Sequence, residues 1–119
     1  MGNNINKRTN PLIFIDLDGT IVLHNYEVEK NFEYVIPSTI NTICMAKRKG
    51  YELCLTTARS KEDCENILEI LRSTYDIIFD YILYDLPAGE RILINDYTVI
   101  KKAKAINVKR NQGVSMCQI

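Results

Sequence analysis

The feature that most constrains the fold of this chain is the apolar run at 12–15, which ends in the sequence DLDGT. A short, continuous apolar run is typical of a strand buried on both faces, and Gly19 predicts a sharp turn directly after it. In an open sheet of parallel strands, ligands bind beyond the carboxyl ends of the strands. The sequence therefore places Asp16, Asp18 and Thr20 where a binding site is expected.

Predicted helices and strands alternate along the rest of the chain. Pro37 and Gly50 mark the start and the stop of one helix, and Ser60 followed by Asp63 predicts the N-cap of a second. An irregular hairpin is expected over 21–35. The other predicted elements are a helix over 61–73 and strands over 51–57, 79–84, 91–95 and 103–107. This alternation favours a mainly parallel sheet wrapped by helices.

The last two predicted strands fit this order poorly. Only residues 96–102 separate them, whereas parallel neighbours usually need a connection of about a dozen residues or more. Either the strand at 103–107 is marginal or a bare loop connects the two.

Length and charge narrow the class of protein. The 119 residues fit one domain, and we expect a loose polar tail at 1–10 followed by a single domain at 11–119. The chain carries 15 Lys and Arg against 15 Asp and Glu, so no net charge draws it to nucleic acid or to an anionic membrane. The basic stretch from Lys101 to Arg110 is interpreted as a solvated face.

The sequence also predicts a compartment. No segment approaches the roughly 18 consecutive apolar residues of a membrane span, and residues 1–10 lack the apolar core of a secretory signal. The four cysteines form no C-x-x-C pair. We therefore expect a cytoplasmic protein with reduced thiols and no membrane partner.

The two carboxylates of DLDGT are the sharpest chemical signal in the sequence. Carboxylates as close as Asp16 and Asp18 repel each other unless a cation or a shared proton lies between them. A hard divalent cation with oxygen ligands, typically Mg²⁺, would meet that need. The alternative is a turn at the end of a strand, in which Asp18 and Gly19 only provide good turn chemistry.

Polar residues follow two further predicted strands. Thr56, Thr57 and Arg59 offer hydroxyl groups and a guanidinium, which suit a phosphate; the alternative is an ordinary helix entry with a surface arginine. Asn95 and Asp96 offer oxygen ligands of the kind that Mg²⁺ accepts, with a turn again as the alternative. Three strand ends with such groups indicate a shared metal and phosphate site more strongly than any one of them.

These three motifs, DLDGT, TTAR and LIND, resemble those of the haloacid dehalogenase superfamily of phosphatases, over roughly residues 11–107. LIND followed by AIN-x-x-R resembles small phosphatase-like members, some of whose relatives act on sugar phosphates. The resemblance implies an α/β fold, a Rossmannoid three-layer sandwich with a mainly parallel sheet. It also implies a phosphomonoester hydrolase that depends on Mg²⁺ and works through an aspartyl-phosphate.

The resemblance further implies a role for each motif residue. Asp16 would be the nucleophile, and Asp18 would be the general acid that protonates the leaving oxygen and then the base that activates water. Thr57 would hydrogen-bond the transferring phosphoryl group, and Thr20 would help to position it. Arg59, whose guanidinium suits a phosphate, is taken as a phosphate ligand. Mg²⁺ would be held by the Asp16 side chain, the Asp18 backbone carbonyl and the pair Asn95 and Asp96.

Two positions depart from the family pattern. The superfamily usually has a lysine before the fourth strand, but here that region reads YDLPAGERILIND. Arg91 is the nearest cation and is taken as a phosphate ligand, with Lys61 as a second candidate. The metal motif often has two acids, whereas its first member here is Asn95, which removes a negative charge from the metal site.

The spacing of the motifs leaves no room for a cap domain, so we expect an open site. An open site suits a large phosphorylated substrate or closure by a second copy of the chain. One alternative function is a domain of this fold that binds phosphate or a partner without efficient turnover, which the missing lysine and Asn95 motivate. Another is a nucleic-acid end phosphatase, against which the neutral net charge argues. The sequence names no substrate and assigns no role to residues 108–119.

Overall fold

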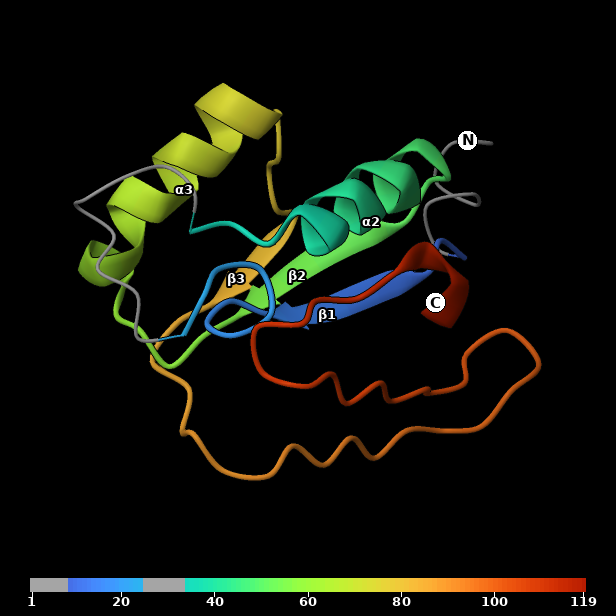
Figure 1. The fold of residues 1–119 in the computed structure, drawn as a ribbon. Helices are drawn as coiled ribbons and strands as arrows, with labels where there is room; N and C mark the ends of the chain where they lie inside the picture. The colour runs from blue at the N-terminus through green and yellow to red at the C-terminus, as the bar shows by residue number, and fades with distance from the viewer. Residues whose placement is uncertain (1–8, 25–33) are drawn as a thin grey trace.

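A parallel three-stranded sheet is the centre of the fold in the computed structural model, which describes residues 9–24 and 34–119. The strands are β1 (Leu12–Asp16), β2 (Glu52–Thr56) and β3 (Tyr81–Leu83), in the spatial order β1-β2-β3 (Figure 1). Asp16 is paired in register with Thr56, and Thr56 with Leu83. The expected α/β class with a parallel sheet is confirmed, and the carboxyl ends of all three strands meet at one edge.

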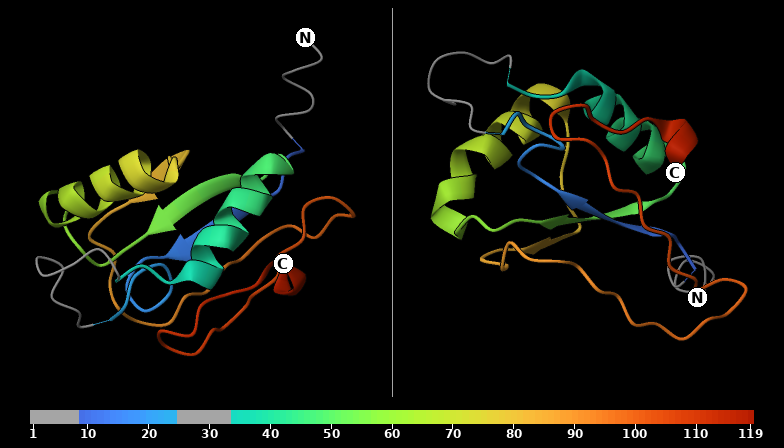
Figure 2. Two further views of the ribbon diagram at one scale, coloured as in Figure 1. Left: turned by 45° about the horizontal axis from the view of Figure 1, so that its top comes forward. Right: turned by 60° about the horizontal axis from the view of Figure 1, so that its bottom comes forward.

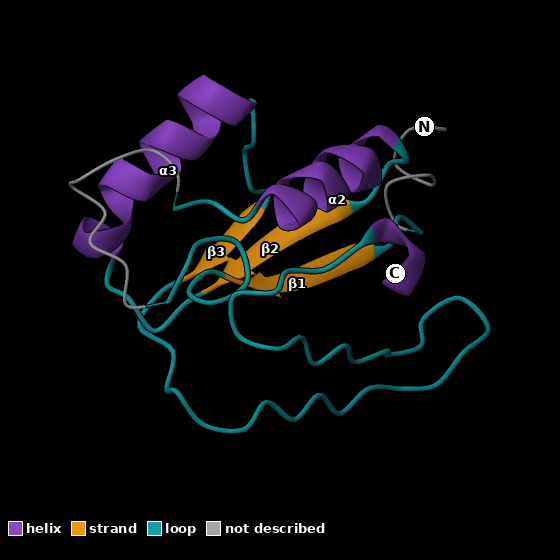
Figure 3. Cartoon of the chain, viewed as in Figure 1, coloured by secondary structure: helices purple, strands orange, loops and turns teal. Residues whose placement is uncertain are grey.

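Two helices connect the strands, as the helix signals predict. Helix α2 (Pro37–Arg48) has its proline in the first turn and ends before Gly50, whose φ is 88°. Helix α3 (Lys61–Tyr75) begins at Ser60, whose side chain accepts a hydrogen bond from the Asp63 backbone N–H at 3.2 Å. A short 3₁₀ helix, η2 (Met116–Gln118), ends the chain (Figure 3).

The core lies between the sheet and these two helices. Ile15, Leu53 and Leu55 contribute from the strands, where alternate side chains point to the same face. The helices add residues at helical spacing to the same cluster: Ile40 and Ile43 from α2, and Cys64, Ile67 and Leu71 from α3. Burial of these side chains fixes β1 and β2 side by side and so fixes the edge at which Asp16 lies.

The opposite face of the sheet has no helix packed on it in the described ranges. Both helices lie on one side of the sheet, and the segment 85–108 runs along the other side (Figure 2). Phe14 is 55% exposed and Tyr81 is 49% exposed on this face. The third layer of the expected sandwich is therefore an extended segment here rather than a layer of helices.

The strands expected over 91–95 and 103–107 are wrong, since both stretches lie in this extended segment without strand pairing. The chain leaves the sheet after β3, where Asp85 adopts a left-handed φ of 57° and the Leu86 N–H is bonded to the Thr57 carbonyl at 3.0 Å. Pro87 follows, which lacks a backbone donor. The apolar side chains of 92–94 remain exposed, and Ile94 reaches 92%.

The expected hairpin over 21–35 is formed at its base. Val22 pairs with Val35 in an antiparallel bridge, flanked by hydrogen bonds from Leu23 to Tyr34 and from Ile36 to Ile21, each of 2.8 Å. Residues 25–33 of the hairpin and most of the expected tail at 1–10 lie outside the described residues. Within those residues no separate cap domain interrupts the fold, and no helix is long and apolar enough to cross a bilayer.

Candidate active site

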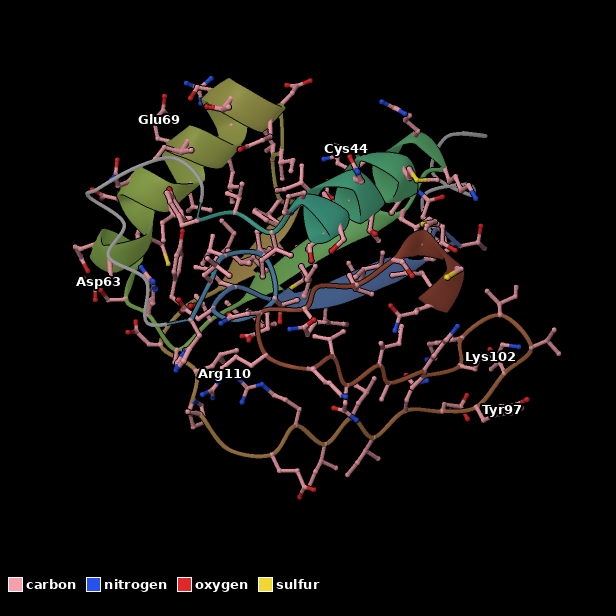
Figure 4. The ribbon with its side chains drawn as sticks, viewed as in Figure 1. Cys44, Asp63, Glu69, Tyr97, Lys102 and Arg110 are labelled. Carbon is pink, nitrogen blue, oxygen red and sulfur yellow. The ribbon has the colours of Figure 1, made fainter. Side chains whose placement is uncertain are left out.

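An open pocket of about 260 Å³ lies at the carboxyl end of β1, where the sequence predicts the site. The DLDGT loop forms one side of it and the C-terminal part of the chain forms the other. Its lining residues are Asp16, Asp18, Gly19, Thr20, Val108 and Arg110. Figure 4 shows Arg110 on the segment that passes beside this loop.

The DLDGT loop is closed by its own backbone. Leu17 is fully buried, and its carbonyl accepts hydrogen bonds from the backbone of Thr20, Ile21 and Val22 at 3.3, 2.9 and 3.1 Å. Gly19 donates back to the Val22 carbonyl at 2.6 Å with a φ of 84°, a conformation that favours glycine. Because Leu17 points into the core, the carboxylates on either side of it are presented to the pocket.

Asp16 is the last residue of β1, and its surroundings shift the pKa of its carboxyl group. Its pKa is raised, first because surrounding protein removes part of its hydration and also because Asp18 is nearby. A hydrogen bond with the Leu17 backbone and the positive charges of Arg91 and His24 oppose this rise in pKa. A raised pKa marks a carboxylate that gains from an added positive charge in the pocket.

Asp18 is held by Arg59, the arginine of the TTAR motif. The Arg59 Nε donates to Asp18 Oδ2 at 3.0 Å and Nη2 donates to Oδ1 at 2.7 Å, with both side chains about three-quarters buried. The third nitrogen, Nη1, lies 3.4 Å from the Asp63 carbonyl. The pKa of Arg59 is raised, chiefly by its hydrogen bonds with Asp18. Arg59 therefore joins the first and second motifs directly.

The two threonines expected to contact phosphate occupy different environments. Thr20 lines the pocket, and its carbonyl accepts a 2.6 Å hydrogen bond from the Thr39 hydroxyl of α2. Thr57 is only 1% exposed, and its hydroxyl accepts a hydrogen bond from the Arg59 backbone N–H at 3.1 Å. Thr57 does not line the pocket, and in this structure it shapes the turn that carries Arg59.

The residues expected from the fourth strand are not brought to the pocket wall. Arg91 lies close enough for its charge to lower the pKa of Asp16, but its Nη1 is bonded to the carbonyls of Pro87 and Gly89 at 2.5 and 3.1 Å. Asn95 and Asp96 are exposed, and the Asn95 amide is bonded within its own loop. The described ranges contain no group of three or more His, Cys, Asp or Glu side chains that could hold a metal ion. The metal roles of Asn95 and Asp96 stay predictions from the sequence.

Sequence reasoning missed Val108 and Arg110. Arg110 is exposed, as the interpretation of the basic stretch as a solvated face predicts, and it also lines the pocket. Its place depends on hydrogen bonds between residues far apart in the chain, for which no local pattern exists. The only local signal is Asn111-Gln112-Gly113, a run of turn-forming residues directly after it.

One comparison with known proteins agrees with the motifs. A family model described as haloacid dehalogenase-like hydrolase matches residues 13–112. A solved structure from Vibrio cholerae, a structural-genomics target, is similar at 21% sequence identity and a TM-score of 0.49, over 69% of this chain and 78% of that one. A search of curated proteins gave no match.

Proposed function

We propose that this chain, which belongs to the haloacid dehalogenase-like hydrolase family, is a phosphomonoester hydrolase that works through Asp16. The observation that carries the proposal is the arrangement at the carboxyl end of β1. Asp16 and Asp18 lie there at one open pocket, and among the described residues only Asp18 has an arginine partner. One carboxylate is thus left for attack on a phosphorus atom, and the other is held beside it for proton transfer.

The chemistry takes two steps. In the first, a carboxylate oxygen of Asp16 attacks phosphorus and the bond from phosphorus to the ester oxygen breaks. Asp18 enters this step protonated and gives that proton to the leaving oxygen. In the second, Asp18 takes a proton from water, whose oxygen attacks phosphorus. The bond from phosphorus to Asp16 then breaks and releases inorganic phosphate, which leaves both carboxyl groups as they began.

Arg59 acts in this scheme as a positioning residue for Asp18. Each oxygen of the Asp18 carboxyl group has a lone pair that does not accept from Arg59, so one of them can carry the proton that is given to the leaving oxygen. The bidentate contact fixes the plane of the Asp18 carboxylate, which a single contact would not. This role differs from the phosphate contact that the sequence predicts, since Arg59 spends three nitrogens on Asp18 and Asp63.

The proposal includes Mg²⁺, held by fewer protein ligands than the sequence predicts. Mg²⁺ is commonly bound through one or two carboxylates together with substrate phosphate and water, and Asp16 is the carboxylate at this pocket without an arginine partner among the described residues. When bound there, the ion would neutralise charge on the phosphoryl oxygens. Because Asn95 and Asp96 lie away from the pocket, we expect weak binding and a need for high Mg²⁺ concentrations.

The shape of the pocket bears on the substrate. It is shallow, and no cap covers it in the described part of the chain, so it can take a phosphoryl group while the rest of the substrate stays outside. We propose a sugar phosphate or another phosphorylated metabolite as the substrate, with closure by a second copy of the chain as one way to exclude water.

The test is phosphate release from a panel of sugar phosphates, nucleotides and oligonucleotide ends, with Mg²⁺ and with a chelator. The variants are Asp16→Asn and, as a control, Asp76→Asn, an exposed helix cap with a left-handed φ of 57° that asparagine also accepts. Release that requires Mg²⁺, disappears in Asp16→Asn and persists in Asp76→Asn supports the proposal. Equal release by Asp16→Asn would contradict it.

One observation favours a second function, a domain that binds phosphate without turning it over. The described pocket lacks the Asn95 and Asp96 ligands and the usual lysine, so the charge of a transition state would be poorly neutralised. A folded wild-type chain that binds phosphate but releases none from any substrate, at any Mg²⁺ concentration, would favour this second function.

A further inference from the structure

We propose that Arg110 is the cation that binds the phosphoryl oxygens in this pocket, and that the segment 108–114, here called the C-terminal strap, holds it there. The inference rests on the proposed function and deepens it. It identifies the group that takes the place of the lysine missing from the region before 91–95. It also gives a role to a segment to which the motifs assign none.

The arginines around the two carboxylates differ in their hydrogen-bond partners. Arg59 is committed to Asp18, and it does not line the pocket. Arg91 is bonded to carbonyls of its own exposed loop and does not line the pocket either. Arg110 lines it, and within residues 9–24 and 34–119 its side chain has no hydrogen bond or ion pair. Its guanidinium is the one that can turn to a ligand without first losing a protein partner.

The strap is fixed to the DLDGT loop. The Asn111 N–H donates to the Gly19 carbonyl at 2.8 Å, and the Asn111 side-chain oxygen accepts the His24 N–H at 2.7 Å. A Cβ built on Gly19 would lie 3.4 Å from Cγ of Arg110, so the stem of the arginine packs against the loop. The position of Arg110 relative to Asp16 and Asp18 is therefore set by the same loop that carries them.

The strap is also fixed to helix α2. Val114 is buried, its carbonyl accepts the Thr42 hydroxyl at 2.7 Å, and its N–H donates to the Thr39 hydroxyl at 3.3 Å. Thr39 in turn donates to the carbonyl of Thr20 at 2.6 Å. The buried threonines of α2 thus join the strap to the same loop from a second side.

The chemistry of the side chain suits the task. A guanidinium presents a planar fork of donors that matches two oxygens of a phosphate, and it stays charged at any working pH. Beside two carboxylates, a phosphate dianion needs a positive charge to enter at all. Neighbouring Lys109 is also exposed, but it does not line the pocket. A positive charge on the strap is therefore not enough to place a residue beside the phosphoryl group.

The experiment measures binding of inorganic phosphate by calorimetry at fixed ionic strength, for the wild-type chain, Arg110→Ala, Arg110→Lys, Arg91→Ala and Lys109→Ala. We expect Arg110→Ala to weaken binding by about tenfold or more, the usual effect of losing a charged hydrogen-bond donor. Arg110→Lys should fall between, because lysine keeps the charge without the fork. Lys109→Ala is the matched control and should stay within about twofold of the wild type.

Each outcome decides the matter. Unchanged phosphate binding in a folded Arg110→Ala chain overturns the proposal, as does a larger loss in Arg91→Ala or an absence of binding in the wild type. Thermal melts of each variant separate loss of the site from loss of the fold. Because the readout is binding, Arg110-dependent phosphate binding without turnover would sink the proposed function while this inference stands. If turnover and product inhibition by phosphate are unchanged in Arg110→Ala, this inference fails while the proposed function stands.

Discussion

Arg59 and Asp18, 41 residues apart in the sequence, are joined by two hydrogen bonds of 3.0 and 2.7 Å that use both carboxylate oxygens. The pair holds one of two adjacent carboxyl groups and leaves Asp16 without an arginine partner among the described residues. An arginine in such a site can hold an acid in place or bind the substrate, and the pair with Asp18 favours the first role for Arg59. Kinetic constants can tell these roles apart.

Replacing Arg59 by alanine should lower kcat by about tenfold or more and change KM little, because the variant loses the orientation of Asp18. Arg72→Ala is the matched control, since Arg72 makes a similar pair with Glu69 on the exposed side of α3. Steady-state kinetics of both variants provide the measurement. A raised KM with an unchanged kcat would instead show that Arg59 binds the phosphoryl group.

Activity should depend on the ionisation of Asp16. In the proposed mechanism its carboxyl group must be ionised to attack phosphorus. Its pKa lies above the ordinary value because of lost hydration and the nearby Asp18. We therefore expect kcat/KM to fall as the pH falls through that raised pKa, at a higher pH than for an ordinary aspartate. A pH profile of kcat/KM between pH 4 and 8 measures this. An acidic limb at or below the pKa of a free aspartate would contradict the expectation.

The Asp16→Asn chain should be inactive and yet more stable at neutral pH. A carboxyl group whose pKa is raised on folding binds its proton more tightly in the native state than in the unfolded chain. Its contribution to stability is thus present below the ordinary pKa and is lost as the pH rises through the raised one. Asparagine removes that cost, so we expect a higher Tm at pH 7 and little difference at pH 3. A lower Tm at pH 7 would show that the charge is compensated in the native site.

Gly113→Ala should destabilise the protein by about 2 kcal/mol or more. Gly113 has a φ of 80°, and an added Cβ would overlap Oγ of Ser38 and lie 2.8 Å from Cγ2 of Ile36. Gly89→Ala is the control, since nothing lies within 4 Å of its Cβ position and its φ is ordinary. Urea unfolding of the two variants gives the difference. Equal stabilities would show that the strap can shift away from α2 at no cost.

Ile94→Ala should change the free energy of unfolding by less than about 0.5 kcal/mol, as expected for an exposed side chain. Ile67→Ala, at a core position of α3 that is 1% exposed, should cost about 2–5 kcal/mol. Urea unfolding again measures both. A comparable cost for Ile94→Ala would mean that residues 91–95 are buried in solution, as their sequence pattern predicts.

Local signals predicted most of the fold, because they act through neighbouring residues. Pro37 and the cap at Ser60 set the helix starts within a residue, and continuous apolar runs located β1 and β2. The run at 92–94 has the same composition as a buried strand, but pairing depends on where β3 and Asp85 direct the chain, which no local pattern encodes. The pocket shows the same limit. Asp16 and Asp18 could be found from their spacing, whereas Arg110 is placed by the bond between His24 and Asn111, 87 residues apart.

Because of that separation, the two walls of the pocket are synthesised at different times. Ribosomes add about 5–20 residues per second, so roughly 5–20 seconds pass between the making of the DLDGT loop and the making of the strap. In that interval the nascent chain carries Asp16 but only one wall of its pocket, and the loop has no Asn111 to bond. A chain that stalls before the strap emerges would hold Asp16 without Arg110. Capacity to hold phosphate would therefore arrive with the synthesis of the strap rather than with the folding of the sheet.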